Sequence, residues 1–169
     1  MGSMSNENPP AVLGAKVEIP FTTTLLVRDT CLCLHVQRAA RVLARRFDRA
    51  LEPVGLTNGQ FSLLMSLNRP DRADMPGIPL ATVGSVAELL GMDRTTVTAA
   101  ARVLFRRGLL VVKADLEDRR TKVMKLTPEG KRVLAAAVPI WEREHGALDA
   151  ELGFADGLRR GLRKLTAGK

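Results

Sequence analysis

The sequence has few aromatic residues, and this scarcity limits the folds that it can form. Tyrosine is absent, tryptophan occurs once, and aromatic residues make up 4% of the 169 residues. Alanine and leucine supply much of the apolar content, and both favour helices, whereas strands are enriched in β-branched and aromatic residues. The composition therefore predicts a mainly α fold, in a chain long enough to bury a core without a disulfide or a metal.

Cysteine and histidine are also scarce. Cys31 and Cys33 are two positions apart, a spacing that suits no unstrained internal disulfide. His35 and His145 lie far apart and have no metal-binding spacing near them. A Gly-x-Ser-x-Gly elbow, a phosphate-binding glycine loop and a nucleophile–base pattern are all missing. We therefore expect no metal site, no cofactor and no enzymatic activity.

Long apolar runs are missing as well. The longest, Val133–Trp141, is too short to span a bilayer and contains Pro139. The N-terminus has no basic segment followed by an apolar one, as a signal peptide would. These features predict a cytoplasmic protein without a membrane partner.

What the sequence does have is positive charge, with a net charge of +8. A basic balance suits a polyanionic partner, and nucleic acid is the first choice. The segment Asp93–Lys125 holds nine basic and four acidic residues, an excess of five in a fifth of the chain. The basic surface is therefore expected to be concentrated in this segment.

Apolar residues at spacings of three and four predict a long first helix, capped by Asp29 or Thr30 and ending at Leu51. Thr57 is placed to cap a second helix that ends at Leu67. The expected buried stripe of this second helix consists of Phe61, Leu64 and Met65.

After an exposed loop over residues 68–79, the pattern predicts a helix-turn-helix. Ser85–Glu88 has the form of a capping box that opens a short helix. Gly91 supplies a left-handed turn residue, and Asp93 caps a longer helix that ends near Arg107. A short helix, a glycine turn and a longer helix make up the helix-turn-helix unit.

Two strand-like segments follow, at residues 109–112 and 121–126, with a charged turn between them. They predict a β-hairpin, or wing. Arg119 and Arg120 at its turn could enter a narrow minor groove, with Asp118 holding a guanidinium in place. Thr127 and Pro128 then begin a helix that continues to about residue 152, and a short helix over 155–165 ends the chain.

The longer helix of the predicted helix-turn-helix has two faces. One face should pack on the neighbouring helices and contains Val97, Ala100, Ala101, Leu104 and Phe105. Arginine, threonine and alanine on the other face suit base edges in a major groove. The expected DNA-contacting residues of this helix are Arg94, Thr95, Thr96, Thr98, Ala99, Arg102 and Arg106. The alternatives are an ordinary amphipathic surface helix, or a winged-helix module whose basic face binds an acidic protein.

Four segments resemble the MarR (multiple antibiotic resistance regulator) family: Leu56–Leu64, Val86–Thr98, Asp118–Arg120 and Leu126–Gly130. The resemblance covers residues 31–152, although the loop over residues 69–83 is longer than the family usually has. It implies a homodimeric transcriptional regulator, expected to be a repressor, that binds a pseudo-palindromic operator in double-stranded DNA. It also implies that Arg119 or Arg120 enters the minor groove and that Asp118 orients it.

The resemblance further implies a small effector, often aromatic or phenolic, bound between the dimerisation helices and the DNA-binding lobe. Residues that could contact it include His35 and Arg38. Cys33 offers an alternative trigger, because its position resembles that of the reactive cysteine in the organic-peroxide-sensing branch of the family, although the tyrosines of that branch are missing here. Simple packing is the alternative for each of these three side chains.

The expected fold is therefore a winged helix-turn-helix with a small β-hairpin wing and dimerisation helices at both ends. The expected division is a flexible N-terminal arm at 1–28, a first dimerisation helix at 29–56, a winged-helix lobe at 57–127 and C-terminal dimerisation helices at 128–169.

Overall fold

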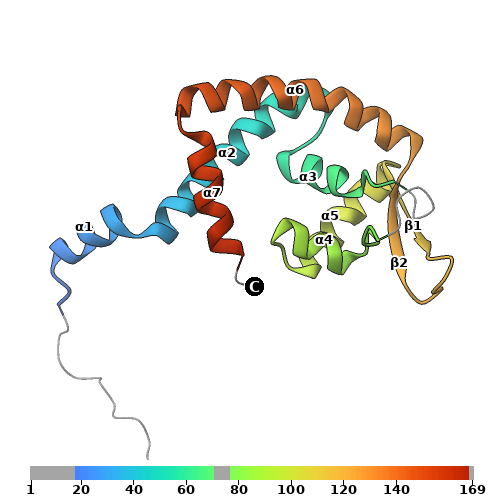
Figure 1. Cartoon of the computed structure of the whole chain (residues 1–169), viewed down its shortest axis with the longest axis horizontal. Helices are drawn as coiled ribbons and strands as arrows, with labels where there is room; N and C mark the ends of the chain where they lie inside the picture. Colours follow the sequence, from blue (N-terminus) through green and yellow to red (C-terminus); the bar gives the residue numbers. More distant parts are fainter. Residues whose placement is uncertain (1–17, 71–76, 168–169) are drawn as a thin grey trace, which may run out of the picture. The chain divides into compact units, whose positions relative to one another are not determined.

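The computed structural model describes residues 18–70 and 77–167. These residues form seven α-helices, one short 3-10 helix and a two-stranded antiparallel sheet (Figure 1). The predicted mainly α, winged helix-turn-helix fold is confirmed. The chain divides after residue 39 into two compact units.

The first unit contains α1 (Phe21–Thr30) and the beginning of α2 (Leu32–Leu51). The sequence predicts an arm up to residue 28 and a helix cap at Asp29 or Thr30. The predicted cap is wrong, because residues 21–30 are already helical and the break falls at Cys31, whose backbone is extended. Residues 1–17 of the predicted arm lie outside the described residues, and its flexibility stays a prediction. Thr30 donates its hydroxyl hydrogen to the Leu26 carbonyl at 2.7 Å, a bond that belongs to the end of α1 rather than to the start of α2.

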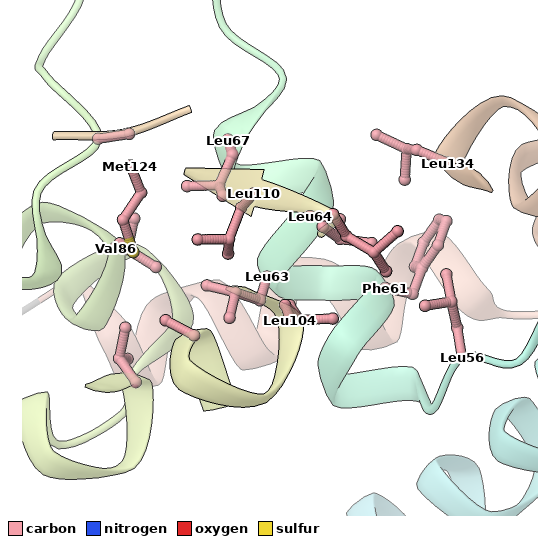
Figure 2. Close-up of a cluster of buried hydrophobic side chains, with 14 of the residues drawn as sticks. Leu56, Phe61, Leu63, Leu64, Leu67, Val86, Leu104, Leu110, Met124 and Leu134 are labelled. Carbon is pink, nitrogen blue, oxygen red and sulfur yellow. The ribbon is translucent and has the colours of Figure 1, made fainter. Parts of the chain in front are cut away.

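In the second unit, the core forms around α3 (Asn58–Leu67), whose cap at Thr57 and end at Leu67 agree with the prediction. Figure 2 shows Leu63 and Leu64 of α3 beside Leu104 and Leu110. The predicted stripe is partly wrong, because Met65 is 40% exposed while Leu63 and Leu67 are buried. Since α3 contacts α4, α5, α6 and β2, little of its surface remains for solvent.

The helix-turn-helix consists of α4 (Val83–Leu90) and α5 (Arg94–Arg106). The expected cap of the short helix is wrong: α4 begins three residues earlier, at the N-cap Thr82. The Ser85 backbone N–H donates to the Thr82 hydroxyl, and the Thr82 N–H donates to the Ser85 hydroxyl, each at 3.1 Å. Ser85 is thus the inner partner of a capping box, and Glu88 has no part in it.

The wing consists of β1 (Leu110–Ala114) and β2 (Lys122–Leu126), paired from Leu110 with Leu126 to Ala114 with Lys122. The backbone N–H of Met124 in β2 also donates to the carbonyl of Ala81, just before α4. Both Val123 and Met124 are buried, because β2 is covered on both faces. The hairpin is thereby attached directly to the helix-turn-helix.

Two more helices complete the chain, α6 (Pro128–Leu152) and α7 (Ala155–Thr166). The predicted cap Thr127 accepts a hydrogen bond from the Gly130 N–H at 2.9 Å, and α6 continues through Pro139. A 3-10 turn, η1 (Glu52–Val54), joins α2 to the segment before α3.

Candidate nucleic-acid interface

The turn between α4 and α5 positions the outward face of α5. Gly91 ends α4 with a left-handed backbone (φ 62°), a conformation that residues with a side chain rarely adopt. The Met92 N–H then donates to the Ala87 carbonyl at 2.9 Å, which closes the turn. Asp93 is the N-cap of α5, as predicted, although its side chain makes no capping hydrogen bond.

The inner face of α5 fixes the helix on the core. Val97 and Leu104 are 1% and 0% exposed, and Ala101 is also buried. Phe105 corrects the prediction, since its side chain is 52% exposed. Each helical residue turns about 100°, so Phe105 lies well to the side of the stripe through Val97, Ala101 and Leu104.

The outer face of α5 carries the predicted DNA-contacting residues, and all seven are exposed. Five of them surround one shallow hollow: Arg94, Thr95, Thr98, Ala99 and Arg102. Thr96 instead lines a second hollow, together with residues of α3 and of the α4–α5 turn. Arg106 lies one turn beyond Arg102, toward the end of the helix.

Two residues that the sequence analysis did not single out support this face. Gly84 in α4 lies beside the Arg94 guanidinium, since a Cβ at Gly84 would be in ordinary van der Waals contact with Nη2 of Arg94, at 3.5 Å. Arg107 donates from Nη1 to Oε1 of Gln60 at 3.1 Å, which ties the end of α5 to the first turn of α3. The Thr57–Gln60 capping box was a visible signal for Gln60, but its partner lies 47 positions away in the sequence.

The wing turn is held by its own carboxylates. Asp115 accepts from the backbone N–H groups of Glu117 and Asp118, each at 3.2 Å. Asp118 accepts from the Thr121 hydroxyl at 2.8 Å and from the Arg120 backbone N–H at 3.0 Å. These two bonds, first the hydroxyl and then the backbone N–H, lower the pKa of Asp118 below its ordinary value.

The expected contact between Asp118 and an arginine guanidinium is therefore corrected. Within the described residues, Asp118 bonds to the backbone N–H of Arg120 and not to a guanidinium. Arg119 and Arg120 are both exposed at the wing turn, where the prediction placed them.

The effector and thiol candidates lie in the first unit. Cys33 and Arg38 are exposed, and Cys31 is partly buried. His35 is exposed, and its Nε2 lies 3.2 Å from the carbonyl oxygen of Asp29. The structure therefore places Cys33, His35 and Arg38 in the first two turns of α2.

In residues 18–70 and 77–167, no helix combines the length and the apolarity needed to cross a membrane. In the same part of the chain, no three His, Cys, Asp or Glu side chains form a group that could hold a metal ion.

Comparison with known proteins assigns the family. No protein-family model matches the chain. Among curated proteins, the chain is 31% identical over 102 residues to the transcriptional activatory protein BadR of Rhodopseudomonas palustris. The match covers 60% of this chain and 55% of BadR, so it spans about half the length of that relative.

Solved structures match over a larger share. A crystal structure of the M. tuberculosis transcriptional regulator MosR in complex with DNA has 36% sequence identity and a TM-score of 0.70, and it covers 81% of this chain and 94% of MosR. A MarR-family regulator from Rhodococcus sp. RHA1 shares the fold at 20% identity and a TM-score of 0.66, covering 83% of this chain and 97% of that one. The chain belongs to the MarR family of winged helix-turn-helix transcriptional regulators.

Proposed function

We propose that this protein is a homodimeric repressor that binds a pseudo-palindromic operator in double-stranded DNA. In this proposal, α5 of each protomer enters a major groove, and Arg119 or Arg120 of the wing enters the adjacent minor groove. The helices within residues 29–56 and 128–169 hold the two protomers together. Successive major grooves on one side of the duplex lie about 34–36 Å apart, which sets the spacing that the dimer must match.

The observation that carries the proposal is the composition of the outward face of α5. Arginine, threonine and alanine side chains surround one hollow there, while Val97 and Leu104 anchor the opposite face. Small side chains allow a helix to approach base edges closely, and arginine binds guanine through two hydrogen bonds. The similarity to MosR, which was crystallised with DNA, supports the same use of this face.

The direct test is binding to operator sites selected from random duplex DNA, measured by fluorescence anisotropy at several salt concentrations. The logarithm of the affinity should fall against the logarithm of salt concentration with a slope of roughly −0.9 per neutralised phosphate. A basic module for an acidic protein would select no preferred DNA sequence, and that result would contradict the proposal.

Two variants separate the roles of helix and wing. Arg102→Ala should change the preferred sequence, at a cost of roughly 1–3 kcal/mol for the preferred base. Arg120→Ala should weaken all sequences alike when its contacts are electrostatic, and should reduce the salt slope by about one. Arg160→Ala serves as the control, because it also removes one positive charge but lies in α7, outside α5 and the wing. Its operator affinity should be unchanged.

We further propose that a small aromatic or phenolic effector lowers the operator affinity, as the family resemblance implies. His35 and Arg38 are available to it because both side chains are exposed. Adding a panel of phenolic acids to the protein–operator complex tests this proposal. At least one compound should release the DNA from the native protein, and the Arg38→Ala variant should require a higher concentration.

One observation also favours a thiol trigger. Cys33 is exposed in the first turn of α2, where an organic hydroperoxide can reach its sulfur. If this trigger operates, an organic hydroperoxide releases the operator from the native protein but not from Cys33→Ser. Unchanged operator affinity in both proteins would exclude the thiol trigger and leave the effector as the only candidate.

A further inference from the structure

The hollow on the outward face of α5 has a chemistry that distinguishes one base from the others. It is lined by Arg94, Thr95, Thr98, Ala99 and Arg102. Alanine contributes only a methyl group, and each threonine carries a methyl group beside its hydroxyl. The middle of the hollow is therefore rich in methyl groups, and arginines lie at its two ends along the helix.

The hydroxyl of Thr98 is already committed as a donor. Its Oγ1 donates to the Arg94 carbonyl at 2.7 Å, within the helix. A threonine hydroxyl has a single hydrogen to donate, so the Thr98 oxygen can only accept a further hydrogen bond. Thr98 therefore offers no donor to guanine O6 or to a purine N7.

The two arginines are available for DNA. In the part of the chain that the structure describes, neither Arg94 nor Arg102 forms an ion pair. They are eight residues apart, or about 12 Å along a helix axis, which is about the rise of three to four base pairs. An apolar group in the hollow would thus lie between two guanidinium groups that can bind guanine or phosphate.

Only one base offers an apolar group in the major groove. Thymine carries a C5 methyl there, while the other three bases present hydrogen-bond donors and acceptors. We infer that the hollow around Ala99 receives the C5 methyl of a thymine in each operator half-site. This inference rests on the proposed function and names the base that the same surface recognises.

The test replaces thymine by deoxyuracil, which removes the C5 methyl and leaves the Watson–Crick pairing intact. Each thymine of a selected operator half-site is replaced in turn, and affinities are measured for the native protein and for Ala99→Val, which fills the hollow. Because burying one methyl group contributes modestly, the native protein should lose about fourfold in affinity at one thymine and little at the others. Ala99→Val should bind the thymine and deoxyuracil forms of that site about equally.

The controls keep the outcomes separate. Circular dichroism and thermal unfolding establish that Ala99→Val folds, and Arg160→Ala should keep the full sensitivity to deoxyuracil. If the native protein binds the operator but no deoxyuracil replacement weakens binding, the methyl inference is wrong and the proposed function stands. The same holds if Ala99→Val loses as much affinity on deoxyuracil replacement as the native protein does. Failure of the native protein to bind any selected DNA overturns both.

Discussion

Gly130, in the first turn of α6, occupies a site with almost no room for a side chain. A Cβ at Gly130 would lie 1.9 Å from the carbonyl oxygen of Leu109, a backbone atom that cannot move aside easily. Thr127 brings the two segments together, because its N–H donates to the Leu109 carbonyl and its hydroxyl donates to the Gly108 carbonyl at 2.7 Å. The absence of a side chain at residue 130 therefore lets α6 begin directly against the end of the helix-turn-helix.

We predict that Gly130→Ala lowers the free energy of unfolding by about 1–3 kcal/mol, the usual cost of forcing an extra carbon into a filled site. Gly146→Ala in the same helix is the matched control, because its added Cβ meets no atom within 4 Å. The control should be neutral or more stable by about 0.5–1 kcal/mol, since alanine favours helices over glycine. Urea denaturation measures both, and equal effects of the two substitutions would contradict the close contact.

At the scale of the element, Asp118 holds the wing turn by hydrogen bonds within the turn, and not by the expected ion pair with an arginine. Its carboxylate accepts from the Thr121 hydroxyl and from the Arg120 backbone N–H. Asp118 therefore fixes the path of the wing backbone, and the position of Arg120 follows from that path. The exposed guanidinium groups of Arg119 and Arg120 stay available for DNA.

This geometry predicts a specific pattern of coupling. Asp118→Ala and Thr121→Val should each reduce operator affinity by about two- to tenfold, which corresponds to about 0.5–1.5 kcal/mol for a hydrogen bond. The double variant should lose less than the sum of the two, because each substitution removes the same bond. Amide hydrogen exchange at Arg120 should accelerate in Asp118→Ala. If Asp118→Ala couples to Arg119→Ala or Arg120→Ala instead, the carboxylate acts through a guanidinium.

The elements also show how far the sequence could predict this fold. Thr57, Gly91 and Thr127 mark helix ends whose capping hydrogen bonds are local, and their positions were predicted. The start of α4 was not, because both Thr82 and Ser85 are residue types that can act as caps, and the structure uses Thr82. Similarly, the periodicity of α5 included Phe105 in the buried face, but only tertiary packing decides where that face ends.

In the candidate site too, local sequence patterns were predictable, and contacts between distant segments were not. The outward residues of α5 follow from helical periodicity, once Val97 and Leu104 are assigned to the core. The hydrogen bond from Arg107 to Gln60 depends on the packing of α5 against α3, and neither residue type alone predicts it. The break between α1 and α2 was missed because Cys31, where it falls, has no helix-breaking side chain.

At the scale of the whole molecule, Arg46 joins α2 to the far end of α6. Its Nη1 lies 2.6 Å from Oε2 of Glu151, and its Nε also bonds to Glu144. The hydrogen bonds from Arg46 hold the pKa of Glu151 below its ordinary value of 4.5. A carboxylate with a lowered pKa stabilises the fold above its unfolded pKa, and that contribution is lost as the pH falls through the folded pKa.

We therefore predict a pH-dependent difference between the native protein and Arg46→Met, which keeps most of the aliphatic stem. The native protein should be the more stable above about pH 5, and the difference should shrink as the pH falls below about 4.5. Urea denaturation between about pH 3 and pH 7 measures this. Asp149 has a lowered pKa through Arg159 in both proteins, so its contribution cancels in the comparison. A difference that stays constant with pH would mean that Arg46 acts by packing alone.

A single chain leaves several large apolar side chains of α7 and α1 exposed. In α7, Leu158, Leu162 and Leu165 recur at spacings of four and three and are 40%, 39% and 56% exposed. In α1, Phe21 and Leu26 are 70% and 61% exposed. Clustered exposed apolar side chains, such as the row on α7, mark surfaces that associate with a partner, and in the proposed homodimer that partner is a second copy of the chain.

Sedimentation should therefore find a dimer, and Leu162→Glu should shift it toward monomer, because the substitution places a charge in the apolar row. Arg160→Gln changes the net charge by the same amount on the other side of α7 and should leave the dimer intact. A palindromic operator binds two recognition helices at once, so the monomeric variant should lose far more affinity for the full operator than for a half-site. If Leu162→Glu remains dimeric, the dimer contact excludes this row; if it becomes monomeric yet keeps full operator affinity, DNA binding does not need the dimer.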